Sequence, residues 1–117
     1  MKYKVIELPL FDIFLHVYII KDVLNLAIQL VAYHSLDVDM FQYPELDGIV
    51  IPLKDNGYIL ILAKLEPSIV AHECNHIMQY LTAGFGLTTE GKYPSYYIGY
   101  ITQQIFDKKG YKEKTKI

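Results

Sequence analysis

The sequence has no tryptophan, a single cysteine and no apolar run of the roughly 18 residues that a membrane-spanning helix requires. The lone Cys74 excludes an intrachain disulfide and fits a reducing compartment. Glu7, Pro9 and Asp12 interrupt the apolar residues near the start, and no small-residue cleavage site follows them. The net charge of -2 provides no reason to expect a nucleic acid or an anionic membrane as partner. We therefore expect a soluble, cytoplasmic protein.

The 117 residues suffice for one hydrophobic core but not for two. Hydrophobic residues make up 52% and charged residues 21%, which is a globular composition and not a disordered one. We find no internal repeat, linker or low-complexity tract. The sequence therefore predicts a single domain over residues 1–110. Residues 111–117, which carry Lys112, Lys114 and Lys116, are expected to form a frayed, solvated basic tail.

The apolar periodicity predicts a small α+β fold in the order ββαββαα. Alternating or β-branched runs predict strands over residues 2–8, 13–20, 48–53 and 58–62. Asn56-Gly57 lies between the last two runs and is a strong hairpin signal, because both residue types tolerate positive φ. Helical spacing predicts helices over residues 23–34 with Asp22 as N-cap, over 68–85, and from near Pro94 to before Gly110. We expect a mostly antiparallel or mixed sheet packed on the second and third helices.

The second predicted helix contains the motif His-Glu-x-x-His at residues 72–76. Residues four apart share one face of a helix, so His72 and His76 can present two imidazole nitrogens to one metal ion. Glu73 lies close enough to that face to reach a water molecule on the metal. This donor set predicts a zinc site with Glu73 as general base. Cys74 points to a different face of the helix and is expected to be a small core residue.

The chain resembles the small zincin-like metallopeptidase proteins encoded by bacteriophages and prophages, and the resemblance extends to about Phe106. The segments that carry it are Leu8-Pro9-Leu10-Phe11, Leu15-His16-Val17, Glu45-Leu46-Asp47-Gly48, Ile69-Val70-Ala71-His72-Glu73-Cys74-Asn75-His76 and Ser95-Tyr96-Tyr97-Ile98-Gly99-Tyr100. The resemblance implies a zincin-like domain, zinc held by His72 and His76, and Glu73 as general base. It also implies a further acidic ligand near the start of the last helix.

The chain departs from the family pattern at that third ligand. Family members tend to carry an acid three positions before the small residue that Ser95 replaces, and Lys92 occupies this place. Glu90 is the nearest acid and is the expected third ligand. Pro94 disfavours a helix that begins as early as Glu90, so Glu90 would reach the metal from a loop.

Other residues are alternative candidates for the third metal ligand or for a group that assists the reaction. Tyr93, His16, His34 and Asp107 are alternative third ligands, although the two histidines and Asp107 fit structural or exposed positions better. Tyr93, Tyr96 or Tyr97 is a candidate donor of a hydrogen bond to a developing oxyanion.

Three functions are compatible with these features. The first is a zinc-dependent peptidase or zincin-like hydrolase acting on a peptide or protein. The second is a non-catalytic, zinc-stabilised phage protein that binds a host or virion partner. In the third, His72 and His76 are core polar groups without a metal. If the chain is encoded by a phage, as the resemblance implies, the expected location is the host cytoplasm, and association with a virion stays open.

Overall fold

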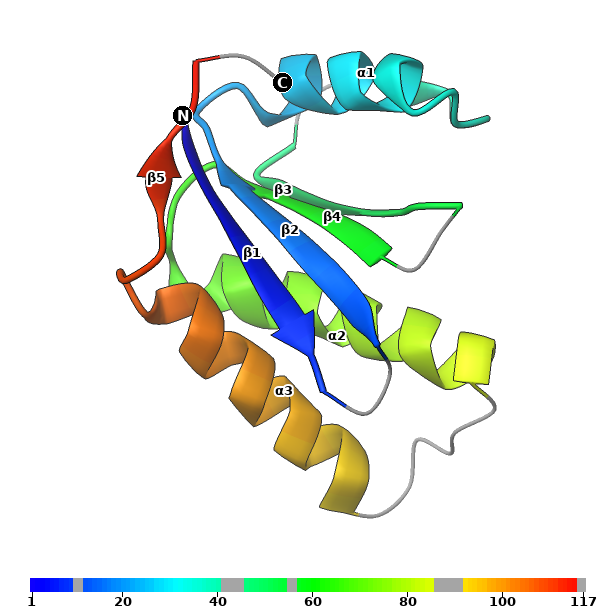
Figure 1. The fold of residues 1–117 in the computed structure, drawn as a ribbon, viewed down its shortest axis with the longest axis vertical. Coiled ribbons are helices and arrows are strands. Elements are labelled where there is room, and N and C mark those ends of the chain that lie inside the picture. The colour runs from blue at the N-terminus through cyan, green and yellow to red at the C-terminus, as the bar shows by residue number, and fades with distance from the viewer. Residues whose placement is uncertain (10–11, 41–45, 55–56, 86–91, 116–117) are drawn as a thin grey trace.

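The structure is a computed structural model of the chain that describes all residues except 10–11, 41–45, 55–56, 86–91 and 116–117. For residues 85 and 92–94 it describes the backbone alone. The described residues form five strands and three helices in the order ββαββααβ (Figure 1). These are β1 (Lys2–Leu8), β2 (Ile13–Ile19), α1 (Val23–Tyr33), β3 (Gly48–Pro52), β4 (Gly57–Leu62), α2 (Pro67–Phe85), α3 (Lys92–Phe106) and β5 (Lys112–Glu113).

The strands in the described part of the chain form one mixed sheet in the order β3-β4-β2-β1-β5. The pairs β1–β2, β3–β4 and β1–β5 are antiparallel, whereas β2 and β4 are parallel neighbours. The antiparallel β3–β4 pair confirms the hairpin that Asn56-Gly57 predicts, although residues 55–56 themselves lie outside the described residues. The sheet is therefore mixed, one of the two arrangements expected from the sequence.

The sheet separates two hydrophobic cores because successive side chains of a strand point to opposite faces. One core joins Leu15, Val17 and Leu60 to α2 and α3, and the other joins Ile59 and Ile61 to α1. Figure 1 shows α1 on one side of the sheet and α2 with α3 on the other. The result is a compact α+β domain with three layers, in which β4 is buried on both faces.

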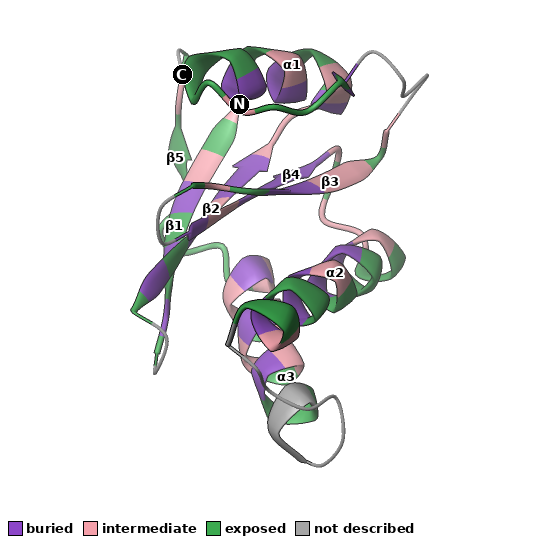
Figure 2. Ribbon diagram, turned by 90° about the vertical axis from the view of Figure 1, so that its right-hand side faces the viewer, coloured by how far each residue is buried: buried purple, intermediate pink, exposed green. Residues whose placement is uncertain are grey.

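The helices follow the apolar stripes that the sequence predicts, and Figure 2 shows that α1 and α2 each bury one stripe and expose another. Asp22 accepts a hydrogen bond from the Asn25 backbone and so caps α1 as predicted. Cys74 is fully buried in the core between α2 and the sheet, which confirms its structural role. Pro94 lies in the first turn of α3, where its missing N–H costs no hydrogen bond. No helix of the described residues has both the length and the apolar character needed to cross a membrane.

The C-terminal segment differs from the frayed tail that its lysines predict. Lys112 and Glu113 pair with the first residues of β1 and form the edge strand β5. Gly110, with φ +89°, makes the turn between α3 and β5. Local sequence patterns do not predict this pairing, because it joins residues about 110 positions apart in the chain.

Candidate metal centre

The helix α2 brings His72 and His76 together on one face, one turn apart. Their Nε2 atoms lie 3.1 Å apart, and the rings are nearly perpendicular, with an interplanar angle of 81°. Two nitrogens that each bind zinc at about 2.0–2.1 Å with tetrahedral angles would lie about 3.3 Å apart. The pair therefore has nearly the spacing that one zinc ion requires.

Glu73 lies beside this pair but is turned toward the sheet, and only 4% of its surface is exposed. Its side chain rests against Gly48 at the start of β3. A Cβ atom on Gly48 would lie 3.0 Å from Glu73 Cγ and 3.3 Å from Glu73 Cδ, closer than side chains normally pack. The absence of a side chain at residue 48 thus makes the space in which the Glu73 carboxyl group sits.

His72, Glu73 and His76 form a group whose ligand atoms all lie within 4.8 Å of one another. It is the only such group of three that the described residues contain. Burial raises the pKa of Glu73 above 4.5, while the positive charges of His72 and His76 act in the opposite direction. A buried carboxyl group of raised pKa is a stronger base than an exposed one, which suits it to accept a proton.

A cleft runs along the edge strand β3 and contains the three residues. One part of it, about 350 Å³, is lined by β3 from Gly48 to Pro52 and by His72, Glu73 and His76. A second part, about 380 Å³, lies toward the N-terminal end of α2 and shares Gly48, His72 and Glu73. Because β3 pairs only with β4 among the described residues, its other edge borders the cleft.

Tyr80 is a cleft residue to which the sequence analysis assigned no role. It follows His76 by four residues on α2, lines the cleft and is 41% exposed. Its ring stacks on Tyr58 of β4, with centroids 5.9 Å apart and an interplanar angle of 25°. The signal for it was present in the sequence, because residues 72, 76 and 80 follow the spacing of one helix face.

The other candidate ligands fall into different places. Glu90 lies outside the described residues, so its role as third ligand stays a prediction. His16 lies between Leu15 and Val17, which face α2, and therefore points to the α1 face of the sheet. There its Nδ1 is 2.7 Å from the Tyr3 hydroxyl oxygen.

His34 and Asp107 also serve at helix ends and not at the cleft. His34 is exposed at the C-cap of α1, where its backbone N–H donates to Leu30. Asp107 is exposed directly after α3, and its carboxylate accepts a hydrogen bond from the Lys109 backbone at 3.0 Å. Neither residue belongs to the group around His72.

The three tyrosines proposed as oxyanion donors differ in their surroundings. Tyr93 lies in the first turn of α3, and its side chain is not described. Tyr96 is 73% exposed, whereas Tyr97 is 3% exposed and donates its hydroxyl proton to the backbone oxygen of Pro9. That hydrogen bond ties α3 to the end of β1, which is a structural use of the Tyr97 phenol.

No protein-family model, no curated protein and no solved structure matches this chain.

Proposed function

We propose that the chain is a zinc-dependent peptidase of zincin-like fold, in which His72 and His76 bind the metal and Glu73 is the general base. The observation that carries this proposal is the buried Glu73 carboxyl group beside two imidazoles whose Nε2 atoms are 3.1 Å apart. The three groups line a cleft beside a strand edge, which is where an extended peptide can lie.

The residues suit zinc better than they suit calcium or magnesium. Two imidazole nitrogens form a borderline-soft donor set, whereas Ca²⁺ and Mg²⁺ prefer a shell of oxygens. Glu90 remains the proposed third protein ligand, supplied by the segment between α2 and α3. A site with three protein ligands leaves a fourth position open, as hydrolytic zinc sites do.

When bound, zinc supplies Lewis acidity that lowers the pKa of water and polarises a substrate carbonyl. Glu73 accepts the proton of the attacking water and delivers it to the departing amine nitrogen as the peptide bond breaks. Because the carboxyl group is buried against Gly48, it is held in one place and is largely shielded from bulk water.

The edge of β3 can position the peptide by strand addition, in which backbone hydrogen bonds hold an extended substrate. The cleft walls are mostly apolar, with Val38, Ile51 and Tyr80 among the lining residues. We therefore propose a substrate with apolar side chains on both sides of the bond that is cut.

A second candidate function is a non-catalytic, zinc-stabilised module that binds a protein partner of a phage or its host. The observation that favours it is a lysine where zincin-like proteins tend to carry an acid, because Lys92 occupies that place at the start of α3. A module of this kind would hold zinc and bind peptide without cleaving it.

Metal analysis of protein purified without a polyhistidine tag tests both functions first. We expect about one zinc per chain, lost in His72→Ala but retained in the matched control His16→Ala, because His16 lies on the opposite face of the sheet. A chain without zinc under these conditions would refute the peptidase and the module together.

Cleavage of a fluorogenic peptide mixture then separates the two functions. We expect cleavage that a chelator abolishes and added zinc restores, and that Glu73→Gln abolishes while zinc content is unchanged. Zinc without cleavage in the unaltered chain would instead support the binding module. Loss of zinc in Glu90→Ala, compared with an unaffected Asp107→Ala, would identify the third ligand.

A further inference from the structure

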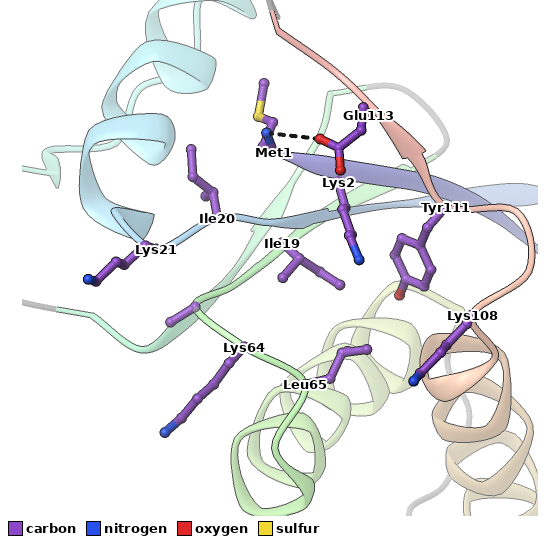
Figure 3. A pocket seen from close by; sticks show the side chains of 11 residues that line it. Met1, Lys2, Ile19, Ile20, Lys21, Lys64, Leu65, Lys108, Tyr111 and Glu113 are labelled. Atoms are coloured by element: carbon purple, nitrogen blue, oxygen red, sulfur yellow. Dashed lines mark ion pairs between the residues drawn. The ribbon is translucent and has the colours of Figure 1, made fainter.

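A second cavity, of about 530 Å³, lies at the end of the sheet where β2 and β4 both terminate (Figure 3). Its walls come from the residues that follow β2, the residues that follow β4, the start of β1 and the segment after α3. It shares no lining residue with either part of the cleft at His72. The cavity is therefore a separate feature of the molecule.

The topology of the sheet explains why a cavity opens there. The parallel neighbours β2 and β4 end side by side, at Ile19 and Leu62. The chain leaves β2 toward α1 on one face of the sheet and leaves β4 toward α2 on the other face. Two connections that diverge in this way leave a crevice beyond the carboxyl ends of the strands, which is the usual ligand site of open sheets with parallel strands.

The cavity gathers positive charge in a chain whose net charge is negative. Lys2 and Lys108 extend into the same space from β1 and from the segment after α3 (Figure 3). Within the described part of the chain, neither ammonium group forms a hydrogen bond or an ion pair. Lys21 and Lys64 lie at the rim, and Lys64 is paired with Glu66 at 3.0 Å.

Among the described residues that line the cavity, Glu113 supplies the one carboxylate, and it is already paired with a positive charge. Glu113 lies 3.7 Å from the N-terminal ammonium of Met1, and the same ammonium donates to the Lys114 carbonyl at 3.3 Å. Glu113 is also the cross-strand partner of Lys2, so this single carboxylate offsets only part of the positive charge of Met1, Lys2 and Lys108. An anion in the cavity would face two cations with little opposing charge.

The floor of the cavity is apolar. Ile19, Leu65 and the ring of Tyr111 surround the space between the two lysines (Figure 3). The Tyr111 hydroxyl donates to the Ile105 carbonyl at 2.7 Å, so the ring presents its carbon surface to the cavity. Burial raises the pKa of Tyr111 to about 12, which keeps the phenol neutral and places no negative charge there.

We propose that this cavity binds a small organic phosphate, with its phosphate group between Lys2 and Lys108 and its carbon skeleton on Leu65 and Tyr111. A phosphate monoester carries nearly two negative charges at neutral pH, which matches two ammonium groups. Lysine is a common phosphate ligand because its point charge does not demand one fixed geometry. The volume of about 530 Å³ suits a small molecule and is in the range of ordinary ligand pockets.

Phenyl phosphate is a direct probe, because it combines a phosphate monoester with an apolar ring. We expect saturable shifts of backbone amide signals at Lys2, Leu65 and Tyr111 when ¹⁵N-labelled protein is titrated with it. Inorganic phosphate should bind more weakly because it cannot contact the floor, and phenol should not bind measurably. The affinity for phenyl phosphate should fall as salt is added, because the lysines are exposed.

Variants of the lysines test the placement of the phosphate. Lys2→Gln and Lys108→Gln should each raise the dissociation constant of phenyl phosphate up to about fivefold, the limit for exposed ion pairs. Lys109→Gln is the matched control, because it removes the same charge next to Lys108 but does not line the cavity. All three positions are exposed, and circular dichroism will confirm that the variants fold.

Four outcomes of the titrations would overturn the proposal. The first is the absence of saturable amide shifts, and the second is amide shifts confined to the cleft at His72. The third is an equal rise of the dissociation constant of phenyl phosphate in Lys108→Gln and Lys109→Gln. The fourth is an equal affinity for phenyl phosphate and inorganic phosphate. Binding to phosphatidylcholine vesicles that contain phosphatidic acid, without binding to phenyl phosphate, would also overturn it, since the phosphate would then be recognised on a lipid surface.

Discussion

Replacing Gly48 with alanine should both destabilise the fold and displace the carboxyl group of Glu73. The new Cβ would lie 3.0 Å from Glu73 Cγ and 3.2 Å from Ile69 Cγ2. Among described glycines only Gly110 has a positive φ, so alanine can adopt the backbone conformation of residue 48. The effect of Gly48→Ala is therefore steric, and it falls on the residue proposed as general base.

The magnitude follows from two opposing contributions. Crowding a well-packed site by one methyl group costs about 1–3 kcal/mol. Replacing glycine by alanine reduces the entropy of the unfolded chain and returns about 0.4–1 kcal/mol. We therefore expect the free energy of unfolding to fall by on the order of 1 kcal/mol, measured as a lower urea midpoint with an unchanged m value. The rate of peptide cleavage should also fall, because the new methyl group displaces the Glu73 side chain from the place that it occupies beside Gly48.

Gly99→Ala is the matched control. Gly99 is exposed within α3, and no atom lies within 4 Å of the position its Cβ would take. This substitution should stabilise the chain by up to about 1 kcal/mol, because alanine is the better helix former. Gly48→Ala combined with Glu73→Ala should recover most of the lost stability, since the contacting Cγ is gone. If Gly48→Ala were as stable as the unaltered chain and equally active, the steric argument would be refuted.

Three further predictions concern the scaffold. Lys4→Met should lower the free energy of unfolding by about 1–3 kcal/mol in urea titrations, because the buried ammonium donates to two carbonyl oxygens at the end of α3, at 2.6 and 2.8 Å. Burial, followed by the positive charges of His34 and Lys114, lowers the pKa of His16 below 6.5. The stability that neutral His16 contributes is present above pH ~6.5 and is lost as the pH falls toward the folded-state pKa. We therefore expect the free energy of unfolding of His16→Gln, measured by urea titration, to depend less on pH below ~6.5. Burial raises the pKa of the Cys74 thiol, so a thiol reagent should label it only at the rate at which the native chain opens.

Each of these three predictions has a control and an outcome that would contradict it. Lys112→Met removes an exposed ammonium and should be nearly neutral, so an equal loss in both lysine variants would contradict the prediction for Lys4. His34→Gln replaces an exposed ring, so the free energy of unfolding of this control should keep most of its pH dependence, unlike that of His16→Gln. Labelling of Cys74 as rapid as that of the urea-unfolded chain would contradict its burial.

The helix cap, the hairpin and the close approach of the two histidines on α2 were predictable because each depends on residues close together in the chain. Asp22 caps α1 through a hydrogen bond to Asn25, three residues away. The β3–β4 pairing follows from one turn, and His72 and His76 meet because a helix repeats every 3.6 residues. Local patterns are sufficient for contacts of this range.

The strand order was not predictable from the same patterns. The parallel pairing of β2 and β4, and the addition of β5 to β1, join segments that are distant in sequence. The sequence of the buried strand β4 is a short apolar run, and such a run can pair with more than one neighbouring strand. Which strands meet is decided by how α1, α2 and α3 cover the two faces, and this depends on the whole chain at once.

The sequence by itself determined that two imidazoles and a carboxylate lie near one another on α2, because helical geometry places them there. Only the tertiary structure decided that Glu73 is buried against Gly48, that the edge of β3 borders the site, and that Lys2 and Lys108 line one cavity with an apolar floor. These features arise where elements distant in sequence pack together, because burial and cavities are properties of the packed elements and not of any single one.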